Sequence, residues 1–151
     1  MKPQGLNLVA VFTRQAHLTT NRHPWELSDA GRTETVNADV QISASHRHIA
    51  GDRYEVTLSA KLVATGGGDT LYTGDFAQCL VADITSFAEH ERANILAYFL
   101  PNQLVPYLRE LISSSTQRTG YAPFVVPALL FQPQPVAETQ TALPGAPRLL
   151  N

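Results

Sequence analysis

Apolar and polar residues alternate along two stretches in the first half of the chain. Apolar residues occupy every second position from Val36 to Ala44, and the residues between them are polar. The same pattern recurs from Tyr54 to Ala64. Because successive side chains of a strand point to opposite faces, each stretch predicts a strand with one buried face.

Two further strands flank this pair in the sequence. An apolar run begins at Leu6 and continues less regularly to Thr20, and a second, irregular run spans residues 70–84. Residues 23–31 contain proline and glycine and are interpreted as a connection. Gly66–Asp69 predicts a hairpin, because consecutive glycines adopt positive φ without steric cost. The short turns favour an antiparallel meander of four strands.

The period of the pattern changes after Ser86. Residues 87–100 are compatible with a helix, and Leu104 to Ile112 continue an apolar helical stripe beyond Pro101, as a second helix or a continuation of the first. A proline inside a helix costs ~3 kcal/mol or more, so Pro101 and Pro106 predict a kink. Strands followed by helix indicate an α+β fold, in which a four-stranded antiparallel sheet carries a long proline-kinked helix on one face.

The last part of the chain divides at about residue 131. Residues 120–131 are apolar, aromatic and interrupted by Pro123 and Pro127, which is typical neither of an ordinary strand nor of an ordinary helix. Such a segment covers a core or forms the wall of an apolar groove. We expect residues 1–131 to form one domain and residues 132–151 to be a mobile Pro/Gln-rich tail.

Composition narrows the class of function. The 151 residues carry 11 Lys and Arg against 13 Asp and Glu, a net charge of -2, which argues against a nucleic-acid binder. No apolar run approaches the ~20 residues of a membrane span, and the N-terminus does not resemble a signal peptide, so we expect a cytoplasmic protein. Charged residues make up 16%, below the ~25% of an average domain, which suggests a surface covered by a partner.

Catalytic and metal-binding patterns are weak. Cys79 lies in a predicted strand, where most cysteines are packing residues, and no nucleophile elbow is present. His46-Arg47-His48 could supply two metal ligands, but no spacing points to a third, so we interpret it as a polar strand end. We therefore expect a protein that is not an enzyme and has no cofactor or metal.

A resemblance to a known family is carried by the proline-containing stretches. They are Pro101-Asn102, Leu104-Val105-Pro106-Tyr107-Leu108-Arg109-Glu110, Gly120-Tyr121, Pro123, Pro127 and Phe131. With these motifs the chain resembles the SecB family of protein-export chaperones from about Leu6 to Phe131. The resemblance implies a homotetramer, assembled as a dimer of dimers through sheet edges and helices. It also implies ATP-independent holding of unfolded polypeptide in apolar grooves.

The resemblance suggests which residues bind client. Val40 and Ile42 match apolar strand positions that the family links to client handling, although packing in the core explains each of them equally well. Trp25 and Leu27, in the connection after the first strand, could line the groove as binding anchors. The alternative for Trp25 is that it caps the edge of the core.

Other positions match assembly and docking sites of the family. Gly74, Phe76 and Gln78 fall on the strand that meets another dimer, and Tyr107 is assigned to the core or the subunit interface. Asp75 keeps an acidic position that the family uses against the SecA motor.

Departures from the family pattern concern SecA. The two acids of the first strand that engage SecA are replaced by Gln15 and Thr19, and a family glycine pair is replaced by Cys79-Leu80. The family's acidic tail is replaced by residues 132–151, in which Glu138 is the single acid. Because acids steer a basic partner, these changes favour a chaperone with a dedicated client, such as the antitoxin of a toxin–antitoxin–chaperone system. The alternatives are a general SecA-coupled export chaperone and, in another class, a small-ligand binding domain or enzyme.

Overall fold

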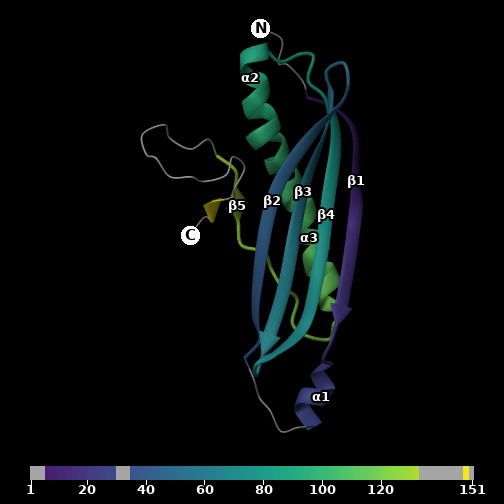
Figure 1. Cartoon of the computed structure of the whole chain (residues 1–151), viewed down its shortest axis with the longest axis vertical. Helices are drawn as coiled ribbons and strands as arrows, with labels where there is room; N and C mark the ends of the chain where they lie inside the picture. The colour runs from purple at the N-terminus through teal and green to yellow at the C-terminus, as the bar shows by residue number, and fades with distance from the viewer. Residues whose placement is uncertain (1–5, 30–34, 133–147, 150–151) are drawn as a thin grey trace.

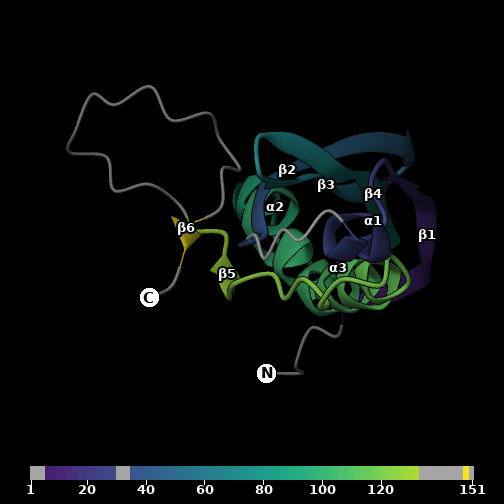
Figure 2. The same cartoon turned by 90° about the horizontal axis from the view of Figure 1, so that it is seen from below.

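Four antiparallel strands form one sheet in the computed structural model, which describes residues 6–29, 35–132 and 148–149 (Figure 1). The strands are β1 (Asn7–Thr20), β2 (Asn37–Ala50), β3 (Arg53–Gly66) and β4 (Asp69–Asp83). A long helical segment packs against one face of the sheet, as Figure 2 shows. The predicted α+β class and the four-stranded antiparallel sheet are confirmed.

The order of the strands is β1-β4-β3-β2, so the predicted meander is correct only for β2, β3 and β4. β1 lies beside β4 instead of beside β2. The turns at Gly51 and at Gly67-Gly68, where φ is positive, keep the last three strands adjacent. The longer connection between β1 and β2, in which a short helix α1 (Pro24–Asp29) forms, lets β1 reach the opposite edge.

The helical segment continues through Pro101, so the second of the two predicted alternatives, a continuation of the first helix, is confirmed. It consists of α2 (Glu89–Asn94), a single π turn η1 (Ile95–Phe99) and α3 (Leu100–Gln117). The Leu100 N–H bonds to the Ile95 carbonyl, five residues back, immediately before the proline. Proline removes one backbone donor and crowds the preceding turn, and a wider turn accommodates both effects. The predicted irregularity therefore takes the form of a π turn.

The core lies between the sheet and α3. The alternating apolar residues of β3 face the helix together with every second residue of β4, because residues paired across the ladder share a face. Among the largest side chains that β3, β4 and α3 contribute to this core, each no more than 1% exposed, are Leu58, Leu62, Tyr72, Phe76, Leu80, Leu100, Leu104, Leu108 and Ile112.

The helix crosses the sheet obliquely. α3 contacts β4, β3 and β1, whereas η1, nearer the other end of the sheet, contacts β2. After α3 the chain runs back along the helix as an extended segment, residues 121–131, which we call the strap (Figure 1). Among the described residues, no helix is long and apolar enough to cross a membrane.

Candidate functional site

The first half of β1 exposes a run of apolar side chains. Leu8, Val9, Val11 and Phe12 are 45%, 47%, 36% and 37% exposed, respectively. Val11 pairs with Leu80, which faces the helix, and Phe12 pairs with Cys79, which faces the other way. The run is therefore apolar on both faces of the sheet. We call Leu8 to Phe12 the β1 apolar edge; long apolar runs on an edge strand are association sites.

Two bulges interrupt the ladder between β1 and β4. The register shifts between Leu8 and Ala10 and again between Thr13 and Gln15, so Val9 and Arg14 are extra residues. A bulge changes the direction of a side chain. Here the second bulge leaves Thr13 on the helix face while Arg14 reaches across β4.

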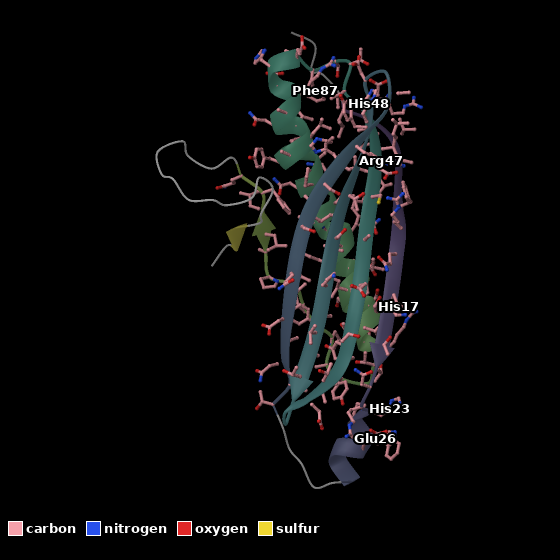
Figure 3. All side chains as sticks on the ribbon, viewed as in Figure 1. His17, His23, Glu26, Arg47, His48 and Phe87 are labelled. Carbon is pink, nitrogen blue, oxygen red and sulfur yellow. The ribbon has the colours of Figure 1, made fainter. Side chains whose placement is uncertain are left out.

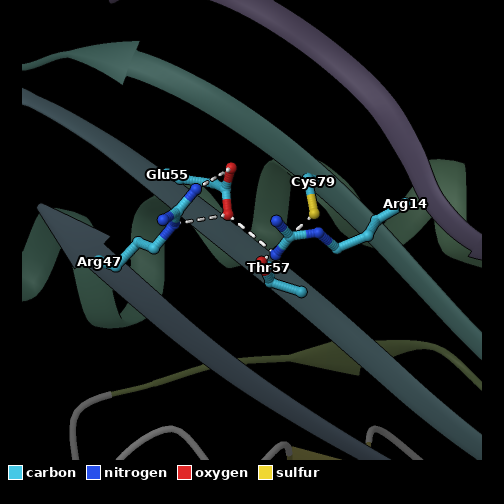
Figure 4. Close-up of polar contacts among 5 residues, drawn as sticks. All are labelled: Arg14, Arg47, Glu55, Thr57 and Cys79. Carbon is cyan, nitrogen blue, oxygen red and sulfur yellow. Dashed lines mark hydrogen bonds and ion pairs between the residues drawn. The ribbon is translucent and has the colours of Figure 1, made fainter. Parts of the chain in front are cut away.

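Arg14 meets Glu55 and Arg47 on the face of the sheet away from the helix (Figure 4). Nη1 of Arg14 donates to Oε1 of Glu55 at 3.1 Å. Arg47 donates to both carboxylate oxygens, from Nε at 3.1 Å and from Nη2 at 3.3 Å. The hydrogen bonds from Arg47 and the charge of Arg14 lower the pKa of Glu55, against the effect of burial, which raises it. The cluster joins β1, β3 and β2 through one carboxylate.

The opposite edge of the sheet, β2, has a different surface. Ala38, Val40, Ile42 and Ala44 are half-buried and pack against the core on the helix side. The polar residues between them are exposed on the other face, which confirms the predicted alternation. We call these four apolar residues the β2 strip. Val40 and Ile42 thus lie at the margin of the core and remain partly accessible; their role in client binding stays a prediction.

Trp25 lies on α1, at the far end of the sheet from α2 (Figure 1). Its side chain is 63% exposed and stacks on His23, with ring centroids 6.3 Å apart and planes inclined by 9°. It is therefore exposed and does not cap the edge of the core. Figure 3 shows His23 and Glu26 at this end and His48 and Phe87 at the other. The side chain of Leu27 lies outside the described part of the chain, and the client role of both residues stays a prediction.

The residues assigned to a subunit contact on β4 are buried within this chain. Phe76 is 1% exposed, and Oε1 of Gln78 accepts a hydrogen bond from Thr13 at 2.8 Å. A Cβ on Gly74 would lie 2.5 Å from Cε2 of Phe76, so only glycine fits beside that ring. These three residues shape the core of the single chain. Tyr107 on α3, by contrast, is 52% exposed. The interface role of all four residues stays a prediction.

Asp75, the predicted docking residue, is half-buried on the face away from the helix. The ladder places it directly between His17 on β1 and Lys61 on β3. Lys61 offsets the charge of this carboxylate, so Asp75 contributes little negative potential to that face. Its docking role stays a prediction.

The two histidines of the weak metal motif lie beside Tyr54. The ring centroids of His46 and His48 are 6.5 Å and 5.1 Å from that of Tyr54, and Nε2 of His48 is 2.6 Å from the Gly51 carbonyl oxygen. Within the described ranges, no group of three or more His, Cys, Asp or Glu side chains could hold a metal ion.

Comparison with known proteins identifies the family of the chain. The model of the SecB family, described as preprotein translocase subunit SecB, matches residues 2–135. The chain therefore belongs to the SecB family of chaperones. It is 26% identical over 121 residues to a protein-export protein SecB of Rhodopseudomonas palustris, covering 80% of this chain and 75% of that protein. It is 27% identical over 130 residues to one of Alkalilimnicola ehrlichii, covering 86% of this chain and 65% of that protein.

A solved structure shares the fold. The Mycobacterium tuberculosis Rv1957 SecB-like chaperone, in complex with a ChAD peptide from the Rv1956 HigA1 antitoxin, superposes with a TM-score of 0.66. The two chains are 17% identical, and the match covers 82% of this chain and 90% of that one. The likeness supports the SecB-like fold.

Two features of the surface were not predicted from the sequence. The β1 apolar edge has a signal, because Leu8 to Phe12 are all apolar and do not alternate, which indicates a strand apolar on both faces. The contact of Arg14 and Arg47 with Glu55 has none, because it depends on a bulge and on the order of the strands.

Proposed function

We propose that the chain is an ATP-independent holdase of the cytoplasm that keeps a dedicated client unfolded, with the antitoxin of a toxin–antitoxin–chaperone system as the class of client. The observation that carries the proposal is the exposed and half-buried apolar surface on both edges of the sheet, in a member of a chaperone family. Apolar burial at ~25 cal/mol per Å² binds many sequences without specific side-chain contacts.

The two edges are assigned different tasks in this proposal. The β1 apolar edge pairs with a second copy, and exposed Tyr107 joins the helices of two dimers in a homotetramer. The β2 strip, with Trp25 and Leu27 as further anchors, contacts the client. Among the described residues β2 pairs only with β3, and its outer backbone edge accepts an extended client as an added strand, a mode of recognition that tolerates varied sequence.

The face away from the helix favours a dedicated client over general export. Gln15 and Thr19 replace acids on β1, and Lys61 offsets Asp75 on that face. The structural relative that binds an antitoxin peptide gives a precedent within the fold. General SecA-coupled export is the second candidate, supported by the retained Asp75 and by the export proteins among the relatives.

The test has two arms. In the first, a chemically unfolded polypeptide is diluted in the presence of the purified chain, and light scattering measures its aggregation. We expect the chain to suppress this aggregation without ATP. In the second, the chain is recovered from its own cells, with SecA added in parallel and a Val40→Thr/Ile42→Thr variant as the matched control. One dominant small partner, lost in the variant and with no SecA retained, supports the proposal. A broad set of precursors with SecA retained supports general export instead.

A further inference from the structure

The strap is an extended segment, and side chains of α3 form hydrogen bonds with its backbone. Nε of Arg109 donates to the Val126 carbonyl at 3.0 Å. Oγ1 of Thr116 accepts the N–H of Phe124 at 2.8 Å. Three such side chains lie on α3 at intervals of about two helical turns, the third being Asn102. One side of the strap is therefore fixed to the helix without a neighbouring strand.

The side-chain amide of Asn102 fixes the last residue of the strap through both its nitrogen and its oxygen. Its Nδ2 donates to the Phe131 carbonyl at 3.0 Å, and its Oδ1 accepts the Phe131 N–H at 2.8 Å. From Asn102 to Thr116 the helix rises about 21 Å, and from Phe124 to Phe131 an extended chain spans about 23 Å. This match in length keeps the strap straight along the helix.

The strap has a second side, and the end of the chain pairs with it. β5 (Leu129–Leu130) is joined antiparallel to β6 (Arg148–Leu149), with Leu130 opposite Arg148 (Figure 2). Pro127 has no N–H to donate, so it interrupts a ladder that continues from β5 towards the start of the strap. The strap thus offers one short backbone edge, and its occupant is the chain's own C-terminal segment.

We propose that this edge docks extended polypeptide and that Arg148–Leu149 is its tethered occupant, which an incoming client must displace. The inference rests on the proposed function, since it regulates the binding of the same clients. A tether holds the segment at an effective concentration of about millimolar, which populates a pairing too short to form between separate molecules. A client with a longer extended stretch pairs with β2 as well and displaces it.

Disulfide trapping in the full chain tests the pairing. Residues opposite each other in an antiparallel ladder have Cα atoms about 4.5–5.5 Å apart, within reach of a disulfide. We expect Leu130→Cys/Arg148→Cys to close at least about tenfold faster than Val125→Cys/Arg148→Cys, because the effective concentration is higher for the paired position. Val125 lies on the same strap but out of register, and the native Cys79 is buried. Equal rates would overturn the inference.

Client binding by the trapped protein tests the competition. The probe is a chemically unfolded, fluorescently labelled polypeptide, titrated with the oxidised and the reduced Leu130→Cys/Arg148→Cys chain. We expect the oxidised form to bind about two- to fivefold more weakly, with full recovery on reduction. Equal affinities overturn the competition. If the wild-type chain holds no client at all, the proposed function and the competition both fail, whereas the trapping rates still decide the pairing.

Discussion

The two edge strands of the sheet present opposite kinds of surface. β1 exposes apolar side chains on both faces, but two bulges break its ladder. β2 exposes polar side chains on one face and half-buried apolar side chains on the other, and its ladder is regular from Asn37 to His48. Apolar side chains favour a stable contact with one matched surface, whereas a regular backbone edge accepts extended chains of any sequence. The comparison explains why assembly is assigned to β1 and client binding to β2.

The edges are joined across the sheet by one buried carboxylate. Glu55 on β3 accepts hydrogen bonds from Arg14 on β1 and Arg47 on β2, and its side chain is 6% exposed. We expect the loss of this cluster to loosen both edges, and a substitution on one edge to affect one task.

The largest effect is expected for Val11→Asp on the β1 apolar edge. A charge buried in a subunit contact without a partner costs several kcal/mol, so self-association should weaken by at least about a hundredfold. Analytical ultracentrifugation over a concentration series measures the change. Val125→Asp is the matched control, since Val125 is 65% exposed and lies on the strap, outside the four-stranded sheet. Equal association of wild type and Val11→Asp would show that β1 is not the contact.

The Gly74→Ala variant tests whether this part of β4 contributes to the core or to the assembly of subunits. The new Cβ would lie 2.5 Å from the Phe76 ring, and overpacking of this kind costs about 1–3 kcal/mol. Urea denaturation should show this loss in the free energy of unfolding, with the association of the folded protein unchanged. A variant that unfolds like wild type but associates poorly would favour the subunit contact suggested by the family resemblance.

Val40→Thr/Ile42→Thr reduces the apolar surface of the β2 strip while keeping branched side chains. We expect client affinity to fall about tenfold, from the loss of roughly 1 kcal/mol or less of apolar burial at each position. Fluorescence titration with an unfolded polypeptide measures it. The control is Gln41→Thr/Ser43→Thr, which alters the exposed face of the same strand. Equal losses in both variants would mean that the backbone edge, and not the apolar strip, binds the client.

The smallest effect is expected for Glu55→Gln, which weakens the link between the edges. At pH 7 the variant should lose about 1 kcal/mol of unfolding free energy, because the two arginines lose their anionic acceptor and one of its oxygens, while both arginines stay partly exposed. The pKa of Glu55 is lowered in the folded chain, so its contribution is complete at neutral pH and disappears as pH falls through that lowered value.

Urea denaturation of both proteins from pH 7 to pH 3 therefore gives curves whose difference begins to shrink near the ordinary pKa of glutamate, about 4.3, and continues to shrink towards the lowered pKa of the folded chain. The pKa of Asp83 is also lowered, by hydrogen bonds from Thr85, but Asp83 is present in both proteins and its effect cancels in the difference. A difference that stays constant with pH would show that the ionised carboxylate does not stabilise the fold.

The sequence predicted the parts of the fold that depend on how often apolar residues recur along the chain. Alternation from Val36 to Ala44 and from Tyr54 to Ala64 identified two strands and the faces they bury, because side-chain direction is a local property. The position of β1 beside β4 was missed, since apolar alternation fixes a face and not a neighbour. The passage of the helix through Pro101 was one of two predicted alternatives. The sequence alone did not decide between them, because the π turn that accommodates the proline is sustained by packing on the sheet.

For the candidate site, the sequence suggested single residues, whose position is now known and whose client role stays a prediction. Trp25 is exposed, and Val40 and Ile42 lie on the accessible margin of the core. The Arg14–Glu55–Arg47 cluster combines three strands and a bulge, so no local pattern announces it. The bonds from Asn102 and Arg109 to the strap likewise depend on how the chain returns along the helix.

The most direct test of the division between the edges measures mass and client binding in one experiment. Fluorescence-detected ultracentrifugation with a labelled unfolded polypeptide reports both for wild type, Val11→Asp and Val40→Thr/Ile42→Thr. We predict that Val11→Asp sediments as a smaller particle that still carries client, and that Val40→Thr/Ile42→Thr keeps the full assembly but binds client about tenfold more weakly. If either variant loses both properties together, the edges are not separate sites and the division between them is wrong.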